Sequence, residues 1–477
     1  MWRLLTVGLV CALAAPVVAG SGGAGAAWHG TVAVPEPRDD PRGPRIVGVY
    51  PNPVAAEDRG EFVVLSVPPG TESGELRLAD GESNVSLPAG LPSGRVAVSS
   101  HPNRTAQLTD RPVARLPDGI ALANGGEKLV LWRGGQILSR IRYSDAPEGE
   151  LLDATTGQWR ALGATARPVV TGGPGRVRLF VLPDAPDAAV RFLREADRRI
   201  LLGGYTLTSR RVTDALAGAA ARGVSVRVLV DGAPVGGVPV AQRRRLDRLA
   251  AAGVEVRALA GERARYAFHH PKYAVVDDRA LVTTENWKPS GIGGRGTRGW
   301  AAITAQPRVV AGLAATFRAD AGWRDAVPWE EFRDRIETGD GGRPDGQFPR
   351  RFEPARVQVR GARLLVAPDN AEGATVSLIR SARESVRIEQ VSIGGRRQPF
   401  LRAALDAARR GVRVRVLLSG AWYVREENRN LTAWLERRAR REGLPLEAKL
   451  ADPHGRFGAI HAKGVIVDGD RAVVGSL

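Results

Sequence analysis

Two copies of one short pattern hold the residue types best suited to chemistry in this chain of 477 residues. In each copy a histidine is followed two positions later by a lysine and seven positions later by an aspartate. The copies are His270, Lys272 and Asp277, and His461, Lys463 and Asp468. One imidazole can attack phosphorus and form a phosphohistidine, while the other protonates the leaving oxygen and later activates water. The lysines can neutralise the phosphoryl oxygens, so the pattern predicts phosphodiester cleavage that uses no metal and no cofactor.

A β-strand through each copy explains its spacing. Side chains two residues apart on a strand share one face, so the histidine and lysine of each copy should lie side by side. Each aspartate falls where the sequence favours a turn. The strands that follow, 279–284 and 471–476, should return beside the first and carry a hydroxyl toward the same pair, Thr284 in one half and Ser476 in the other.

The C-terminal part of the chain has an α/β pattern that repeats. Beyond residue 170, strands alternate with amphipathic helices rich in alanine and arginine. The segment 221–230 closely resembles the segment 409–418, and the histidines recur at nearly the same offset. An offset this long indicates duplicated domains rather than short stacked repeats. We therefore predict a first half at 170–330, a linker at 331–355 and a second half at 356–477.

On these paired motifs, residues 176–477 resemble the phospholipase D superfamily, whose members carry two such His-Lys-Asp motifs. The resemblance implies a duplicated α/β fold. It implies that His270 is the nucleophile and His461 the general acid. It also implies that Lys272 and Lys463 bind phosphate, while the two aspartates support the geometry of the motifs.

The family's Gly-Ser-x-Asn continuation is matched in part. It corresponds to 475–477 in the second half and to 283–286 in the first, where threonine replaces glycine. This resemblance adds Thr284, Asn286 and Ser476 as candidate substrate-binding residues. The family would continue past this point, so we expect the second half to be incomplete at Leu477.

The N-terminal third contains a different kind of structure. Residues 1–19 have the charge, apolar segment and small-residue end of a cleaved secretory signal, and residues 20–44 are typical of a linker. Residues 45–145 contain short alternating segments bounded by Gly, Pro and Asn, which predicts an all-β sandwich. The sole cysteine, Cys11, lies in the signal, so a secreted mature protein would have neither disulfides nor thiol chemistry.

This β-sandwich resembles the lamin-tail domain of secreted prokaryotic proteins. The resemblance rests on the Tyr-Pro-Asn-Pro run at 50–53, on Glu-Phe-Val-Val-Leu at 61–65 and on Leu-Ala-Asn-Gly-Gly at 122–126. It implies a binding or spacing module, and no catalytic constellation occurs in this region.

The formal charge is +18, and almost all of the 69 Lys and Arg residues are arginines. Arg-rich faces attract an anionic polymer or a membrane surface, and no obligate protein partner is implied. The substrate is a phosphodiester, phospholipid or nucleic acid. We favour a secreted phospholipase D-like enzyme that acts on phospholipid headgroups. The alternatives are an extracellular endonuclease that uses the same site on DNA or RNA, and an inactive truncated protein that binds nucleic acid or the envelope. A lipase would need an apolar approach surface, and the sequence indicates no obvious membrane-inserting loop.

Overall fold

The computed structural model describes residues 6–13, 43–117, 120–259, 265–336, 338–339 and 346–476. The described residues fall into two compact units. Unit 1 comprises those within 18–164 and 261–267, and unit 2 comprises those within 4–17, 165–260 and 268–477.

Three predicted segments lie wholly or partly outside the described residues. Of the signal 1–19 only residues 6–13 are described, and of the linker 20–44 only residues 43 and 44. The linker 331–355 lacks residues 337 and 340–345. These three assignments stay predictions.

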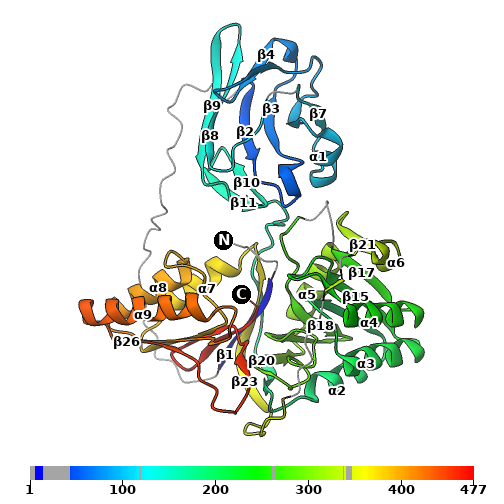
Figure 1. Ribbon diagram of the computed structural model, residues 1–477, viewed down its shortest axis with the longest axis vertical. Helices are drawn as coiled ribbons and strands as arrows, with labels where there is room; N and C mark the ends of the chain where they lie inside the picture. The colour runs from blue at the N-terminus through cyan, green and yellow to red at the C-terminus, as the bar shows by residue number, and fades with distance from the viewer. Residues whose placement is uncertain are drawn as a thin grey trace. The chain divides into compact units, whose positions relative to one another are not determined.

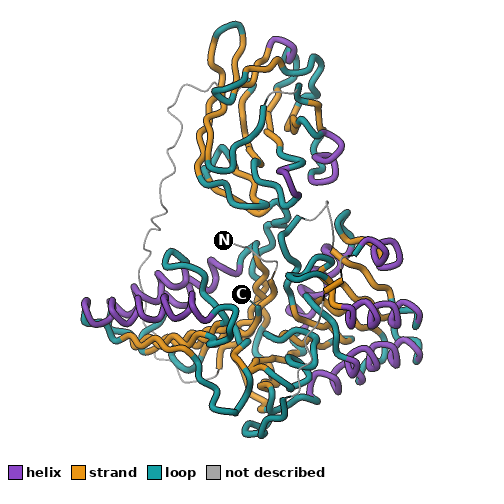
Figure 2. Tube along the Cα trace, in the orientation of Figure 1, coloured by secondary structure: helices purple, strands orange, loops and turns teal. Residues whose placement is uncertain are grey.

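Unit 1 consists of two β-sheets that share one apolar core (Figures 1 and 2). The six-stranded sheet has the order β11 (Gln158–Ala161), β10 (Glu150–Asp153), β2 (Arg45–Tyr50), β3 (Phe62–Val67), β6 (Gly94–Ser99) and β7 (Val113–Arg115). The four-stranded sheet has the order β5 (Asn84–Ser86), β4 (Leu76–Ala79), β8 (Gly126–Arg133) and β9 (Gln136–Ser144). Val63 and Leu65 of β3 meet Leu78 of β4 in this core, as strand alternation requires.

The structure of unit 1 differs from the expected all-β region 45–145 in two ways. Strands β10 and β11 belong to its larger sheet, so the sheet continues to Ala161. One helix, α1 (Pro102–Leu108), covers the outer side of β3, where Leu108 packs with Phe62 and Val64. Two short 3-10 turns, η1 (Ala56–Asp58) and η2 (Ser73–Glu75), lie in the connections.

The first half of unit 2 is a mixed sheet with helices on both faces. Its elements are β12 (Val170–Gly172), β13 (Gly175–Leu182), α2 (Ala188–Arg194), β14 (Arg199–Gly204), α3 (Arg210–Ala221), β15 (Ser225–Asp231), β16 (Val238–Pro239), α4 (Val240–Ala251), β17 (Glu255–Leu259), β18 (Lys272–Val276), β19 (Arg279–Thr283), β20 (Thr297–Thr304), α5 (Pro307–Ala321), β21 (Ala326–Pro328), α6 (Trp329–Phe332), η4 (Arg333–Arg335) and β22 (Thr338–Gly339). Strands β14, β15 and β17 are parallel, and β18, β19, β20 and β13 extend the sheet antiparallel. Helices α2, α3 and α4 bury their apolar sides on one face (Figure 1).

The second half follows the same order of pairings. Its elements are β23 (Ala355–Ala367), α7 (Ala371–Arg380), β24 (Ser385–Gln390), α8 (Pro399–Arg409), β25 (Arg413–Leu418), α9 (Arg425–Glu442), β26 (Leu446–Leu450), β27 (Ala459–Ile460), β28 (Gly464–Val467) and β29 (Arg471–Gly475). Strands β24, β25 and β26 are parallel, while β28 pairs antiparallel with β24 and β29. Helix α8 buries Leu401, Ala404, Leu405 and Ala408, which share one side at helical spacing.

The sheets of the two halves are joined through β23. This strand pairs with β12 and β13 on one side and with β1 (Thr6–Leu13) on the other. Strand β1 also pairs with β29, so it lies between β23 and β29 (Figure 1). Among the described residues, no helix is long and apolar enough to cross a bilayer.

Candidate active site

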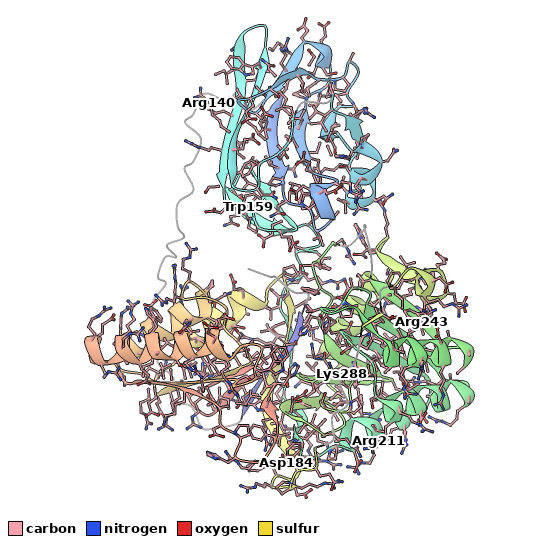
Figure 3. All side chains as sticks on the ribbon, in the orientation of Figure 1. Arg140, Trp159, Asp184, Arg211, Arg243 and Lys288 are labelled. Atoms are coloured by element: carbon pink, nitrogen blue, oxygen red, sulfur yellow. The ribbon has the colours of Figure 1, made fainter. Side chains whose placement is uncertain are left out.

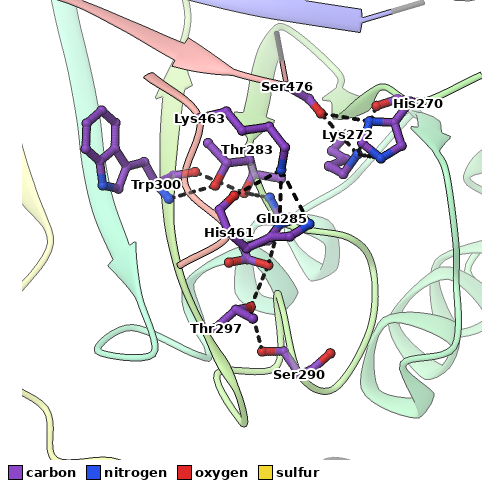
Figure 4. Close-up of polar contacts among 11 residues, drawn as sticks. His270, Lys272, Thr283, Glu285, Ser290, Thr297, Trp300, His461, Lys463 and Ser476 are labelled. Atoms are coloured by element: carbon purple, nitrogen blue, oxygen red, sulfur yellow. Dashed lines mark hydrogen bonds and ion pairs between the residues drawn. The ribbon is translucent and has the colours of Figure 1, made fainter. Parts of the chain in front are cut away.

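The structure brings the two His/Lys pairs together in one cluster (Figure 4). His270 precedes β18 and Lys272 is the first residue of that strand, which is fixed between β14 and β19. His461 follows β27, and Lys463 precedes β28. Strand β27 pairs with β20 of the first half, and the His461 backbone N–H donates to the carbonyl of Arg298 at 2.9 Å. A strand of the first half therefore positions the histidine of the second.

His270 lies among groups from both halves. The Lys272 Nζ atom is 3.0 Å from Nδ1 and 3.1 Å from Nε2 of the ring, and it donates to the His270 carbonyl at 2.9 Å. The Ser476 Oγ atom lies 3.1 Å from His270 Nδ1 and accepts a hydrogen bond from Lys272 at 3.1 Å. The ring of Tyr205 stands edge-on to the imidazole with centroids 4.4 Å apart.

His461 has a similar surrounding with one chemical difference. The Lys463 Nζ atom is 3.4 Å from both ring nitrogens and donates to the His461 carbonyl at 3.0 Å. The contact at Nδ1 comes from the Glu285 carboxylate, whose Oε2 atom is 3.3 Å away. Each histidine is thus held at Nδ1 by a residue of the opposite half, a serine at His270 and a carboxylate at His461. In both rings Nε2 contacts the lysine of its own pair, at 3.1 Å in His270 and at 3.4 Å in His461.

Burial sets the charge state of the cluster. Burial, followed by the charges of Lys272 and Lys463, lowers the pKa of His270 well below its usual value. The pKa of His461 falls to about 4 for the same kinds of reason, although Glu285 acts in the opposite direction. Burial lowers the pKa of Lys463 to about 8, and burial together with Lys463 lowers that of Lys272. Without substrate, the site therefore favours neutral imidazoles.

Glu285 is the residue that the sequence analysis missed. It follows β19, and Ser476 follows β29, at the same distance in sequence from Asp277 and Asp468 respectively. This equal spacing would have identified Glu285 as the counterpart of Ser476. Matching by residue type selected the hydroxyl of Thr284 instead. Burial opposes ionisation of Glu285, but His461 and Lys463 outweigh it and lower the pKa of this carboxyl group.

The hydroxyl of Thr284 bonds backbone rather than a His/Lys pair, while the substrate-binding role expected of Asn286 stays a prediction. The Thr284 Oγ1 atom accepts a hydrogen bond from the backbone N–H of Trp300 at 3.0 Å, so its hydroxyl serves the connection to β20. The Asn286 side chain is buried, and its Oδ1 atom has no partner among the described residues. Ser476 reaches the His/Lys pair of the first half rather than its own. Neighbouring residues of an extended chain point to opposite faces. Glu285, one position after Thr284, therefore faces the site in the place that was expected for Thr284.

The two motif aspartates lie at turns and bind backbone. Asp277 accepts hydrogen bonds from the N–H groups of residues 197, 198 and 199, each at 2.9 Å. Asp468 accepts from those of residues 383, 384 and 385 at 2.8–3.2 Å. Burial opposes their ionisation, but these N–H donors lower both pKa values. The aspartates thus tie each hairpin to the start of β14 or β24.

Two glycines make room for the Glu285 carboxylate. A Cβ atom at Gly299 would lie 2.2 Å from Oε1, and one at Gly291 would lie 2.6 Å from Oε2. The hydroxyl of Thr297 donates to Oε2 at 2.8 Å (Figure 4). The other oxygen, Oε1, is buried with no hydrogen-bond partner among the described residues. Local backbone therefore fixes where this charge lies.

Within the described parts of the chain, no three acidic, histidine or cysteine side chains form a group that could hold a metal ion. The side chains gathered at the site are two imidazoles, two ammonium groups, one carboxylate and one hydroxyl.

Comparison with known proteins places this site in a recognised domain type. Residues 189–321 and 375–477 match the family described as "Cardiolipin synthase, PLD-like domain", and these segments include both His/Lys pairs. The chain therefore carries a PLD-like domain, and members of this superfamily act on phosphodiesters. No curated protein matches the chain.

Solved structures with detectable similarity are distant. A phospholipase D family member, Nuc from Salmonella typhimurium, is 18% identical over 32% of this chain and 97% of that chain, with a TM-score of 0.29. Phosphatidylserine synthase from Haemophilus influenzae is 11% identical over 62% and 81%, with a TM-score of 0.41. Polyphosphate kinase from Porphyromonas gingivalis is 16% identical over 63% and 47%, with a TM-score of 0.40.

Proposed function

We propose that this chain, with its PLD-like domain, is a secreted phosphodiesterase that hydrolyses phospholipids without a metal, through a phosphohistidine intermediate. The observation that carries the proposal is the crosswise cluster of the two His/Lys pairs. Lys272 and Lys463 supply two positive charges where a phosphodiester anion would bind, and each imidazole is held at Nδ1 by the opposite half while its Nε2 contacts the lysine of its own pair.

The chemistry divides between the two histidines. In the first step, His270 Nε2 forms a bond to phosphorus as the bond to the leaving oxygen breaks, and protonated His461 gives its proton to that oxygen. In the second step, neutral His461 takes a proton from water, whose oxygen attacks phosphorus and releases His270. The products are an alcohol and a phosphomonoester. The role of Glu285 is to favour the protonated form of His461, while His270 has only cationic and neutral neighbours in the cluster.

The phosphodiester anion itself supports this division. A bound phosphate adds negative charge beside both rings, which opposes the effect of burial on their pKa values. Only His461 has a second negative group, Glu285, at hydrogen-bond distance from Nδ1. A proton taken up when substrate binds is therefore retained best at His461, which is the residue that must act as the general acid.

An endonuclease that uses the same site is the second candidate. The formal charge of +18 favours it, because a polyanion would be attracted over the whole surface. Figure 3 shows Arg211 on α3 and Arg243 on α4, both on outer helices. Arg211 pairs with Asp187, and Arg243 lies 3.6 Å from Asp334, so part of this positive charge is neutralised within the chain. The third alternative, an inactive binding protein, is disfavoured by the presence of a His/Lys pair in both halves.

The remaining assignments concern the rest of the chain. We propose that residues 1–19 direct secretion, that unit 1 is a lamin-tail-like binding module, and that the halves of unit 2 arose by duplication. Two sheets around one core support the second assignment, and the shared order of pairings supports the third. Export can be tested by expression in a bacterial host and mass measurement of the secreted chain.

The test of the proposed function measures headgroup release from phospholipid vesicles in excess EDTA. We expect turnover by the native chain, none by His270→Ala, and slow release with an acid-labile phosphoryl-enzyme in His461→Ala. His454→Ala is the matched control, because His454 is exposed and outside the cluster. A supercoiled plasmid is assayed in parallel. Plasmid cleavage without headgroup release would favour the endonuclease, and full activity of His270→Ala would refute the two-histidine mechanism.

A further inference from the structure

Exposed large hydrophobic side chains gather in a few segments of unit 2. Among the described residues they are Val235, Val240, Phe352, Trp422 and Tyr423. Trp422 is 86% exposed and Val235 is 79% exposed, values that are costly for such residues unless something covers them. Segments 232–237 and 419–424 contain three of the five. They follow β15 and β25, the second of the three parallel strands in each half. We call these two segments the first and second apical loops.

The first apical loop contacts the environment of His270. The backbone N–H of Val235 donates to the hydroxyl oxygen of Tyr205 at 2.7 Å. The ring of Tyr205 in turn lies edge-on to the His270 imidazole, with centroids 4.4 Å apart. Only one side chain thus separates the exposed Val235 from a catalytic group.

The second apical loop borders the approach to His461. A groove of about 370 Å³ is lined by Gly420 and Ala421, which precede Trp422, and by Ala459 and Ile460, which precede His461. The rings of Trp422 and Tyr423 contact each other with centroids 5.7 Å apart. The pKa of Tyr423 is raised, first by partial burial and then by the negative charge of Glu285.

Two arginine side chains lie beside the second apical loop. Arg425 and Arg429 of α9 line the same groove. Within the described parts of the chain neither forms an ion pair, in contrast to Arg409 and Arg438, which pair with Glu442. An aromatic pair beside unpaired arginines is the composition that proteins present to the interface of an anionic bilayer.

A third segment with an exposed large hydrophobic side chain contains Phe352. Phe352 is exposed and its ring lies 5.8 Å from the Arg298 guanidinium, which also lies 4.9 Å from the ring of Phe457. The carbonyl of Arg298 holds the backbone of His461. Apolar groups therefore lie close to the catalytic cluster on three segments.

We propose that the two apical loops and Phe352 form a surface that docks on anionic phospholipid bilayers, with Trp422, Tyr423 and Val235 inserted at the interface. The proposal rests on the proposed function in that docking would bring the scissile phosphodiester to the two histidines. A single nucleic-acid strand is the competing occupant, since aromatic rings stack on bases. The aliphatic Val235 cannot stack, and its exposure favours lipid.

The test uses the full chain with vesicles of phosphatidylcholine alone or with 30% phosphatidylglycerol. Binding is measured by co-sedimentation, and turnover is measured on the vesicles and on soluble bis(4-nitrophenyl) phosphate. The variants are Trp422→Ser with Tyr423→Ser, Val235→Ser, and Arg425→Gln with Arg429→Gln. Arg437→Gln is the control, because Arg437 is exposed on the same helix and does not line the groove.

We expect the aromatic double variant to bind vesicles at least 10-fold more weakly and to keep its rate on the soluble diester. Each arginine lost should weaken binding to the anionic vesicles about five-fold, with little effect on the neutral ones. Unchanged vesicle binding in the aromatic and valine variants would overturn the proposal, as would an equal loss on the soluble diester. Loss of oligonucleotide binding with vesicle binding retained would also overturn it, in favour of a stacking platform. If the native chain binds vesicles through these residues but cleaves neither substrate, the docking surface stands and the proposed function fails.

Discussion

Replacing Glu285 with glutamine tests whether this carboxylate sets the role of His461. The change keeps the shape of the side chain and removes its negative charge. With a separation of 3.3 Å between Oε2 and Nδ1, and an effective dielectric constant of about 20, the attraction to a protonated imidazole is about 5 kcal/mol. A glutamine carbonyl would restore part of that through a hydrogen bond. A net loss of about 3–4 kcal/mol corresponds to a fall of about 10²- to 10³-fold in rate.

The leaving group makes this test specific. An alkoxide must be protonated as it departs, whereas 4-nitrophenolate departs without general-acid help. We therefore expect Glu285→Gln to lose about 10²- to 10³-fold in kcat on a short-chain phosphatidylcholine and less than about 10-fold on bis(4-nitrophenyl) phosphate. Glu285→Ser, which copies the residue found at 476, should behave in the same way.

Two controls separate this positioning role from a general structural one. Glu447→Gln removes an exposed carboxylate on β26 that pairs with Arg415, and it should leave both rates unchanged. Thermal unfolding of Glu285→Gln should match that of the native chain to within a few degrees. Equal losses on the two substrates would refute the reasoning, because a general acid cannot be equally important for both leaving groups.

Three further predictions follow from the same geometry. Because the pKa of Lys463 is lowered to about 8, kcat/KM should fall as pH rises through about 8, and Lys463→Arg should move that decline to higher pH in a pH–rate profile. Asp277→Asn should lower the free energy of unfolding by about 2 kcal/mol at pH 7, since the carboxylate binds three backbone N–H groups. The pKa of Asp277 is lowered on folding, so its contribution is complete above the unfolded value of 3.8 and declines as pH falls from there through the folded pKa; urea unfolding at pH 7 and pH 3 should therefore show a smaller deficit of the variant at pH 3. Gly299→Ala should displace the Glu285 carboxylate and reproduce the leaving-group selectivity of Glu285→Gln, which the same pair of substrates would detect.

Local patterns were sufficient to predict the elements that carry the site. The period of two on a strand predicts that His270 lies beside Lys272, and the two side chains are in contact, although β18 begins only at Lys272 and β28 only after Lys463. The turns expected at Asp277 and Asp468 occur, and both residues have positive φ angles there. In these cases the prediction depends only on neighbouring residues, which the sequence specifies directly.

Features that depend on distant segments were not predictable in this way. Ser476 contacts His270 of the first half rather than His461 of its own half, and this contact depends on how two hairpins approach each other. Glu285 was passed over because a hydroxyl was expected at that point. A Trp-Tyr pair directly after a strand is more typical of a core than of a surface, so the exposure of Trp422 became visible only in the fold. Strands β10 and β11 are four residues each, too short to give a clear alternating pattern.

The position of β1 within the sheet conflicts with the cleaved signal that the sequence predicts for the same residues. Residues 6–13 bridge β23 and β29, yet they belong to the segment that the sequence assigns to a cleaved leader. A chain that folds before export would sequester its own leader inside a sheet, so export requires the segment to be captured while the chain is still unfolded. A chain trimmed after export would leave one edge of β23 and one of β29 without this partner, and open edges recruit strands from other molecules. If the proposed leader is cleaved, the order of cleavage and folding would then decide whether these two strand edges are exposed.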